Sequence, residues 1–312
     1  MRLPEEELMY GKMRSGYLGM VITRAGTRIK RDEATFSMGI ERNAKRAVRE
    51  AQPWLIWFGR CGYVAKGVVY TLIGALAVQA AIGAGGQTTD SKGALKQVGN
   101  APFGEFLLIT IGVGLVGYAL WRFIQAFMDT ENKGQKAKGI AVRLGYFCIG
   151  LFHVGLAIVA FRLVAGDDGS KGDSTQSWTA NLMSQPFGRW LVGISGAIVI
   201  ARAAFHLYRA FSVNFRKKLN LREMSATEDK WATRFGRVGY AARGIVFVII
   251  GIFLVLAALY EDPREARGLE GALDTLARQP WGSTVLGAVA LGLVCYGMFK
   301  FVEARFRRMV IT

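Results

Sequence analysis

The chain has 312 residues, of which 40 are Lys or Arg and 23 are Asp or Glu, and its mean hydropathy is +0.25. A chain with 20% charged residues that still averages apolar must segregate its charges from long apolar runs, which excludes disordered, collagen-like and disulfide-stapled proteins. The net charge of +17 would be typical of a nucleic-acid-binding protein, so its meaning depends on where the charges lie.

The N-terminal segment, residues 1–53, is polar and basic. Because it lacks an early apolar run, we expect no cleavable signal peptide. Its stretch 41–50, ERNAKRAVRE, precedes Trp54 and Trp57 and predicts a basic helix lying against anionic lipid. The sequence leaves open whether translation starts at the first Met or at Met38.

Six apolar stretches follow, each close to the ~20 residues that a helix needs to cross a ~30 Å hydrocarbon layer. Because backbone polar groups in lipid must be satisfied within the segment, runs of this length predict transmembrane helices. They lie near residues 61–82, 103–128, 144–165, 187–211, 238–260 and 281–302.

The basic residues between the stretches are distributed unequally. Segments that share one side with both termini carry 26 Lys and Arg, against 6 in the opposite loops. The positive-inside rule therefore places both termini in the cytoplasm. The positive charge is then chiefly a topology signal, and we expect no nucleic-acid partner.

The six stretches form three pairs with two shared motifs. The first stretch of each pair opens with R-x-G-Y-x-x-x-G and the second with Pro-aromatic-Gly. The first glycine of the former motif precedes the proline of the latter by 40, 41 and 41 residues in the three pairs. The motif residues are Arg60, Gly62, Tyr63, Gly67, Pro102 and Gly104; Arg143, Gly145, Tyr146, Gly150, Pro186 and Gly188; and Arg237, Gly239, Tyr240, Gly244, Pro280 and Gly282. We expect the proline at the first position of its helix and the tyrosine at the membrane surface, in an aromatic belt.

Each pair has an even number of spans, so all three copies enter the membrane in the same direction, unlike an inverted-repeat transporter. The prediction is an all-α integral membrane six-helix bundle of three parallel two-helix repeats with pseudo-threefold symmetry. Its parts are the cytoplasmic or interfacial segment 1–53 and repeats at 54–129, 138–215 and 231–308. Before each proline lies a short, partly amphipathic stretch, G-A-L at 93–95 and 271–273 but different in the second copy.

These motifs resemble the bacterial membrane proteins of domain-of-unknown-function family 1206, over about residues 54–308. The resemblance implies a multi-pass protein of the bacterial inner (plasma) membrane and implies no activity. Mitochondrial carriers also have three two-helix repeats, but their P-x-[DE]-x-x-[KR] signature is missing here.

Polar residues recur on one face of the second stretches, at equal offsets in the three copies. One interpretation is snorkelling of basic side chains to the inner head-groups. The other is a cytoplasm-facing basic vestibule on the pseudo-threefold axis, which would bind an anionic solute or lipid head-group. The candidate ligand-binding residues are Lys66, Arg122, Arg202, His206, Arg243 and Lys300.

Other chemistry has little support in the sequence. Cys61, Cys148 and Cys295 form no C-x-x-C pair and are interpreted as buried thiols, and no spacing indicates a metal site. Haem ligation by His153 and His206 is not expected, because neither histidine recurs in the other copies. We find no nucleophile with an adjacent base.

We therefore expect a non-enzymatic structural, regulatory or partner-binding membrane component without catalytic residues, metal or cofactor. Its expected partners are the lipid bilayer and anionic phospholipids, and no protein partner is indicated. The alternative is a small transporter or channel for an anionic solute or lipid head-group.

Overall fold

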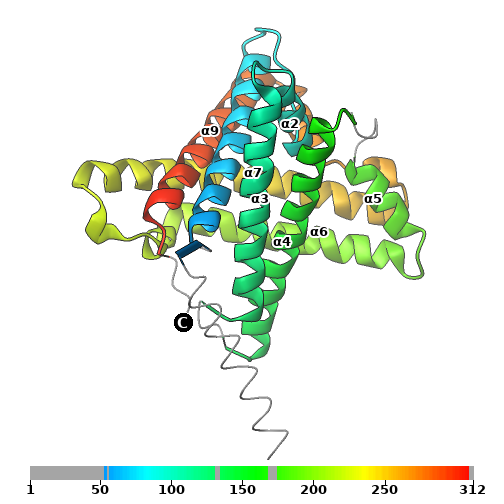
Figure 1. Cartoon of the computed structure of the whole chain (residues 1–312). Helices are drawn as coiled ribbons and strands as arrows, with labels where there is room; N and C mark the ends of the chain where they lie inside the picture. The colour runs from blue at the N-terminus through cyan, green and yellow to red at the C-terminus, as the bar shows by residue number, and fades with distance from the viewer. Residues whose placement is uncertain (1–52, 55, 131–133, 168–173, 309–312) are drawn as a thin grey trace, which may run out of the picture. The chain divides into compact units, whose positions relative to one another are not determined.

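The computed structural model describes residues 53–54, 56–130, 134–167 and 174–308, and the helices described belong to one compact unit, residues 54–310. Six helices are long and apolar enough to cross a membrane (Figure 1). They are the first span Ile56–Ala81, α3 Gly104–Phe127, α4 Ala137–Val164, α6 Gly188–Ser212, α7 Ala226–Tyr260 and α9 Gly282–Phe306. The predicted all-α, six-span class is confirmed. The basic helix predicted at 41–50 lies outside the described residues.

Short helices precede the second long helix of each repeat. They are α2 Ser91–Gly99, α5 Ser174–Met183 and α8 Leu269–Ala277, and the connections also contain the 3-10 helices η1 Asn214–Lys218, η2 Leu221–Glu223 and η3 Pro263–Glu265. The G-A-L stretches lie in α2 and α8, where Leu95 and Leu273 are fully buried. Asp90 begins α2 by accepting hydrogen bonds from two backbone N–H groups of its first turn.

The Pro-aromatic-Gly motif forms the same turn three times. The proline does not begin the helix as predicted, because each long helix starts at the motif glycine and the aromatic residue before it has a φ of +61° to +63°. A side chain at this glycine would overlap the last carbonyls of the preceding short helix, for example that of Gly99 at Gly104. Glycine is therefore required for the sharp entry into the helix.

The third repeat begins its first helix earlier than its apolar run. α7 starts at Ala226, twelve residues before the predicted boundary at 238. Ser225 and Glu228 form a capping box, in which each side chain binds the other residue's backbone N–H. A polar first turn with its own cap extends the helix beyond the apolar segment.

Consecutive repeats pack through equivalent positions. Gly150 of α4 lies against Phe123 of α3, and Gly244 of α7 lies against Leu207 of α6. The first span closes the same kind of contact with the last helix, where its Gly67 meets Phe301. In each case the glycine allows the two helices to approach closely, as small residues do between membrane helices.

Packing within the repeats differs in the second copy. In the first and third repeats, Gly62 lies directly against Tyr118 and Gly239 against Tyr296, whereas a side chain added at Gly145 of α4 would meet nothing within 4 Å. In Figure 1, α6 accompanies α7 across the direction of α3 and α4. The second repeat therefore leaves an open seam between α4 and α6.

The open seam has a cause in the sequence. Gly114 of α3 and Gly292 of α9 contact the first helix of their own repeats, and the equivalent residue of α6 is Ile198. A branched side chain holds the two backbones apart where glycine lets them touch. Five of the six helix contacts that a threefold arrangement requires are thus present.

We predict that Gly239→Ala destabilises the protein and Gly145→Ala does not. The methyl group at position 239 would overlap Tyr296, and overpacking of this kind costs about 1–3 kcal/mol. Position 145 has free space, and alanine favours the helix. Thermal unfolding in detergent measures both variants. Equal losses of stability would contradict the open seam.

Candidate anion-binding site

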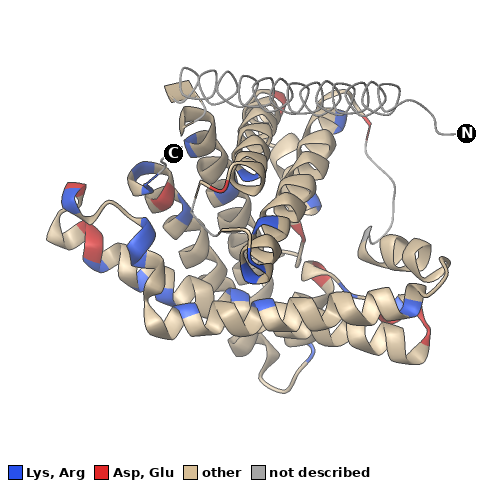
Figure 2. Cartoon of the chain, turned by 90° about the horizontal axis from the view of Figure 1, so that it is seen from below, with Lys and Arg blue, Asp and Glu red and all other residues tan. Residues whose placement is uncertain are grey.

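Polar side chains from all six long helices meet in one contiguous group, termed here the axial cluster. Its members are Tyr63, Lys66 and Tyr70 of the first span, Tyr118, Arg122 and Gln125 of α3, His153 of α4, His206 and Arg209 of α6, Tyr240 and Arg243 of α7, and Tyr296, Lys300, Glu303 and Arg307 of α9. Figure 2 shows isolated blue Lys and Arg segments along long helices that are otherwise tan.

The repeat explains why these residues meet. Arg122, His206 and Lys300 each lie 20 residues after the proline of their own repeat. Since the second helices enter by the same turn and pack in the same register, side chains at equal offsets point to a common centre. The helix face predicted from the sequence is therefore the face that lines this centre.

In the first repeat, the hydroxyl group of Tyr118 accepts hydrogen bonds from two cations. The Arg122 Nη2 atom lies 2.5 Å and the Lys66 Nζ atom 3.4 Å from the Tyr118 oxygen. Both cations also lie over the Tyr118 ring, at 4.8 and 4.9 Å from its centroid. Arg122 donates further hydrogen bonds to Gln125 Oε1 (2.7 Å) and to the hydroxyl of Tyr63 (3.4 Å).

The third repeat repeats this pattern with different partners. Arg243 donates to the hydroxyl of Tyr296, and Lys300 Nζ lies 4.5 Å over the same ring. Lys300 also forms an ion pair with Glu303, whose second oxygen accepts from Arg307 Nη1 at 2.5 Å. Glu303 therefore holds together two cations that would otherwise repel each other.

The cluster contains more cations than anions. Among the described residues, Glu303 is the only buried carboxylate, whereas Lys66, Arg122 and Lys300 are each at most 8% exposed. Tyrosine rings stabilise nearby cations by about 0.5–2 kcal/mol each, which offsets part of the cost of removing a charge from water. An uncompensated positive charge remains.

Several nitrogen atoms of the cluster are buried without a hydrogen-bond partner among the described residues. They include both ring nitrogens of His206 and the Nε atoms of Arg122 and Arg243. His206 is 1% exposed and stacks on Tyr240, with ring centroids 5.4 Å apart. Buried polar atoms normally have partners, so unpaired nitrogens beside excess positive charge are the groups that the acceptor oxygens of an anion would satisfy.

The structure brings together five of the six predicted ligand-binding residues: Lys66, Arg122, His206, Arg243 and Lys300. The sixth, Arg202, is exposed on α6. The five pack against tyrosines in a closed group, whereas the sequence had suggested an open vestibule.

Two interpretations of single residues were wrong. Tyr63 and Tyr240 do not form a surface belt, since they are 1% and 2% exposed and belong to the cluster. The spacing of Tyr63, Lys66 and Tyr70 along one helix face was the signal that could have shown this. Cys148 is exposed because it lies on the open face of α4, and it is not a buried thiol.

His153 and His206 contact different tyrosines, Tyr118 and Tyr240, on different helices. The Nδ1 atom of His153 lies 2.7 Å from the carbonyl oxygen of Ile149. No group of three His, Cys, Asp or Glu within the described ranges could hold a metal ion.

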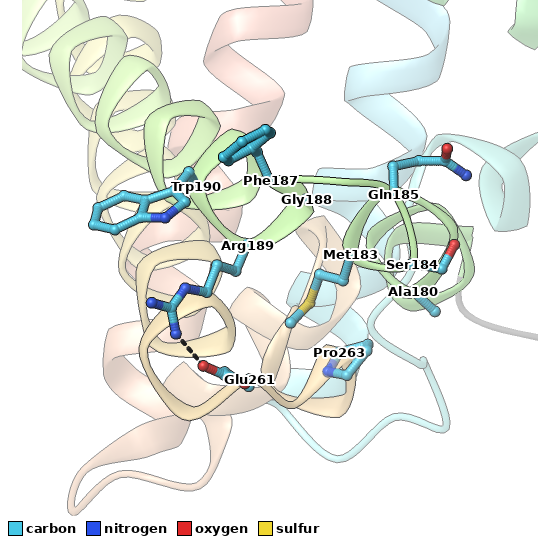
Figure 3. Close-up of a pocket in the computed structure, with 10 residues that line it drawn as sticks. All are labelled: Ala180, Met183, Ser184, Gln185, Phe187, Gly188, Arg189, Trp190, Glu261 and Pro263. Carbon is cyan, nitrogen blue, oxygen red and sulfur yellow. Dashed lines mark hydrogen bonds and ion pairs between the residues drawn. The ribbon is translucent and has the colours of Figure 1, made fainter.

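A hollow of about 570 Å³ lies away from the axial cluster, at the N-terminal end of α6 (Figure 3). Arg189 and Glu261 form an ion pair across its wall, and Phe187 and Trp190 are exposed beside it. Because its ion pair is balanced and solvent-exposed, it has no excess charge that requires a ligand.

The fold and the cluster define a helical membrane protein of three tandem two-helix repeats around buried polar residues. The sequence profile of the family described as "Domain of Unknown Function (DUF1206)" matches three times, over residues 61–129, 144–212 and 238–307, and the chain belongs to this family. It is 38% identical over 269 residues to the uncharacterised protein YxxB of Bacillus subtilis (strain 168), covering 86% of this chain and 97% of that protein. No solved structure matches the chain.

We predict that Glu303→Gln strongly destabilises the protein. The substitution leaves Lys300 and Arg307 buried without their carboxylate, and removing one partner of a buried ion pair typically costs about 3–5 kcal/mol. Chemical unfolding in detergent measures the loss. Asp167→Asn serves as the control, because its pair with Arg162 is exposed and should change stability by about 1 kcal/mol at most. If Glu303→Gln left the free energy of unfolding unchanged, the cluster would be hydrated and not buried.

Proposed function

We propose that this protein is a non-enzymatic component of the bacterial inner membrane that binds one anionic, phosphate-bearing group in the axial cluster. The observation that carries the proposal is the excess of buried cations over buried carboxylates, of which the described part of the chain contains one, Glu303. An oxyanion supplies both the missing charge and the acceptor oxygens that the Nε atoms of Arg122 and Arg243 lack.

The distribution of basic residues supports access from the cytoplasmic leaflet. With both termini in the cytoplasm, the cluster lies in the inner half of the bundle, because Lys300 is six residues before the end of α9 at Phe306. Phosphate groups of anionic lipids and of phosphorylated metabolites are both concentrated on that side.

The competing role is a structural or partner-binding component whose cluster only holds the helices together. This role explains the tyrosine contacts and the ion pairs of Glu303. It leaves the charge of Lys66 without a carboxylate among the described residues, because the hydrogen-bond partner of Lys66 is the hydroxyl of Tyr118. The charge balance therefore favours a bound anion.

Thermal unfolding of the full chain with increasing sodium phosphate, after prolonged exchange has removed any co-purified anion, tests the proposal, with sodium chloride of equal ionic strength as the salt control. We expect phosphate to raise Tm, because a ligand at 100 times its Kd stabilises the folded state by about 2.7 kcal/mol. Phosphatidylglycerol added to the detergent micelles is the second probe, because it carries a phosphate group on a lipid.

Arg243→Met is expected to abolish the rise in Tm with both probes, since it removes the cation that donates to Tyr296. Arg234→Met on the same helix is the matched control, because Arg234 is exposed and lies over Trp231 outside the cluster. If neither probe stabilises the wild-type protein beyond the chloride control, the anion-binding function is wrong and the structural role stands.

A further inference from the structure

The seam between α4 and α6 uncovers residues whose counterparts are buried in the other repeats. Val69 of the first span and Val246 of α7 are 3% and 0% exposed, but the equivalent Phe152 of α4 is 58% exposed. On the second helices, Trp121 and Phe299 are 2% and 0% exposed.

The residue of α6 that corresponds to Trp121 and Phe299 is Phe205, which is 42% exposed. About two helical turns earlier, Ile198 is 64% exposed. Both sides of the seam are therefore apolar surfaces of membrane helices, and in a bilayer they face lipid chains.

A polar path leads from this seam into the axial cluster. Arg202 takes the place of the buried Tyr118 and Tyr296, yet it is exposed, and its guanidinium carbon lies 5.4 Å over the Phe205 ring. One turn further along α6 comes His206, with its two unpartnered ring nitrogens.

Beyond His206, the Nη1 atom of Arg209 donates to the hydroxyl of Tyr240 at 3.3 Å. The Tyr240 ring lies 5.5 Å from Lys300 Nζ. Positive and hydrogen-bonding groups thus follow at successive turns of α6, from its lipid-facing surface towards the centre of the cluster.

We propose that the α4–α6 seam binds an anionic phospholipid that enters sideways from the membrane. Arg202 and His206 line the route by which its phosphate group reaches the axial cluster, and an acyl chain lies along Phe152, Ile198 and Phe205. The inference rests on the proposed anion-binding function and names the source of the anion. A cation placed among exposed apolar side chains matches a ligand with a charged head and an apolar tail. A soluble anion would not contact the apolar side chains.

Direct packing of α4 against α6, as in the other two repeats, is not expected to fill the seam. The small residues that close the other repeats are Ala65 against Gly114 and Ala242 against Gly292, and their place is taken by Cys148 and Ile198. Closing the seam would also bury Arg202 without a carboxylate, which is costly in lipid.

Native mass spectrometry of the full chain with phosphatidylglycerol, or with phosphatidylcholine for comparison, provides the first test. We expect Arg202→Gln to weaken retention of phosphatidylglycerol about tenfold, since a hydrogen bond to a charged group contributes at least about 1.5 kcal/mol. Arg234→Gln, an exposed arginine outside the seam, should retain it as the wild type does. Equal retention by Arg202→Gln and the wild type would overturn the inference.

A disulfide test measures the seam itself. With Cys61 and Cys295 replaced by alanine, Ile198→Cys and the native Cys148 occupy positions whose counterparts touch in the first repeat, where a Cβ at Gly114 would lie 3.1 Å from that of Ala65. We expect phosphatidylglycerol to slow oxidation of this pair relative to phosphatidylcholine, because the bound lipid separates the helices. Equal rates in both lipids would mean that no anionic lipid occupies the seam.

The failures of the two proposals differ. Stabilisation by phosphate that depends on Arg243, combined with lipid retention indifferent to Arg202, overturns the lipid seam and leaves the anion-binding function intact. Lack of stabilisation by either probe removes both.

Discussion

A positive charge inside a membrane protein must be compensated, because low-dielectric surroundings cannot solvate it. This constraint governs the centre of the six-helix structure. Tyr118 and Tyr296 receive two cations each through their hydroxyl groups and ring faces, and Glu303 joins Lys300 to Arg307. These contacts reduce the cost of burial, but they provide only one formal negative charge. The remaining imbalance is the physical basis for assigning an anion to the cluster.

The threefold repeat brings the buried cations and tyrosines together at the centre of the structure. Each second helix starts at a turn that only glycine allows, so equivalent residues of α3, α6 and α9 enter the bundle in the same register. Glycines of the first helices then let neighbouring repeats approach closely. The second repeat departs from the pattern where Ile198 replaces glycine and Arg202 replaces tyrosine. These two sequence differences have separate effects, because Ile198 opens the seam and Arg202 places a cation in it.

Much of the fold could be predicted from the sequence, because span length and the repeated motifs are each local signals. The face carrying Arg122, His206 and Lys300 was also predictable, since helical periodicity determines it. The closed packing of the cluster could not be predicted, because it depends on contacts between helices far apart in sequence. One example is Arg307, whose guanidinium carbon lies 5.0 Å over the Tyr63 ring. The exposure of Cys148 and Arg202 escaped prediction for the same reason, since it follows from how far α6 lies from α4.

Phosphorus content per chain tests the central claim most directly. The purified protein, exchanged into phosphate-free buffer and a detergent without phosphorus, is measured by inductively coupled plasma mass spectrometry. We expect about one phosphorus atom per wild-type chain, because a buried anion in a low-dielectric site leaves slowly, and a clear loss in Arg243→Met. A wild-type chain free of phosphorus that remains fully folded would contradict the account, because its buried cations would then be stable without an anionic partner.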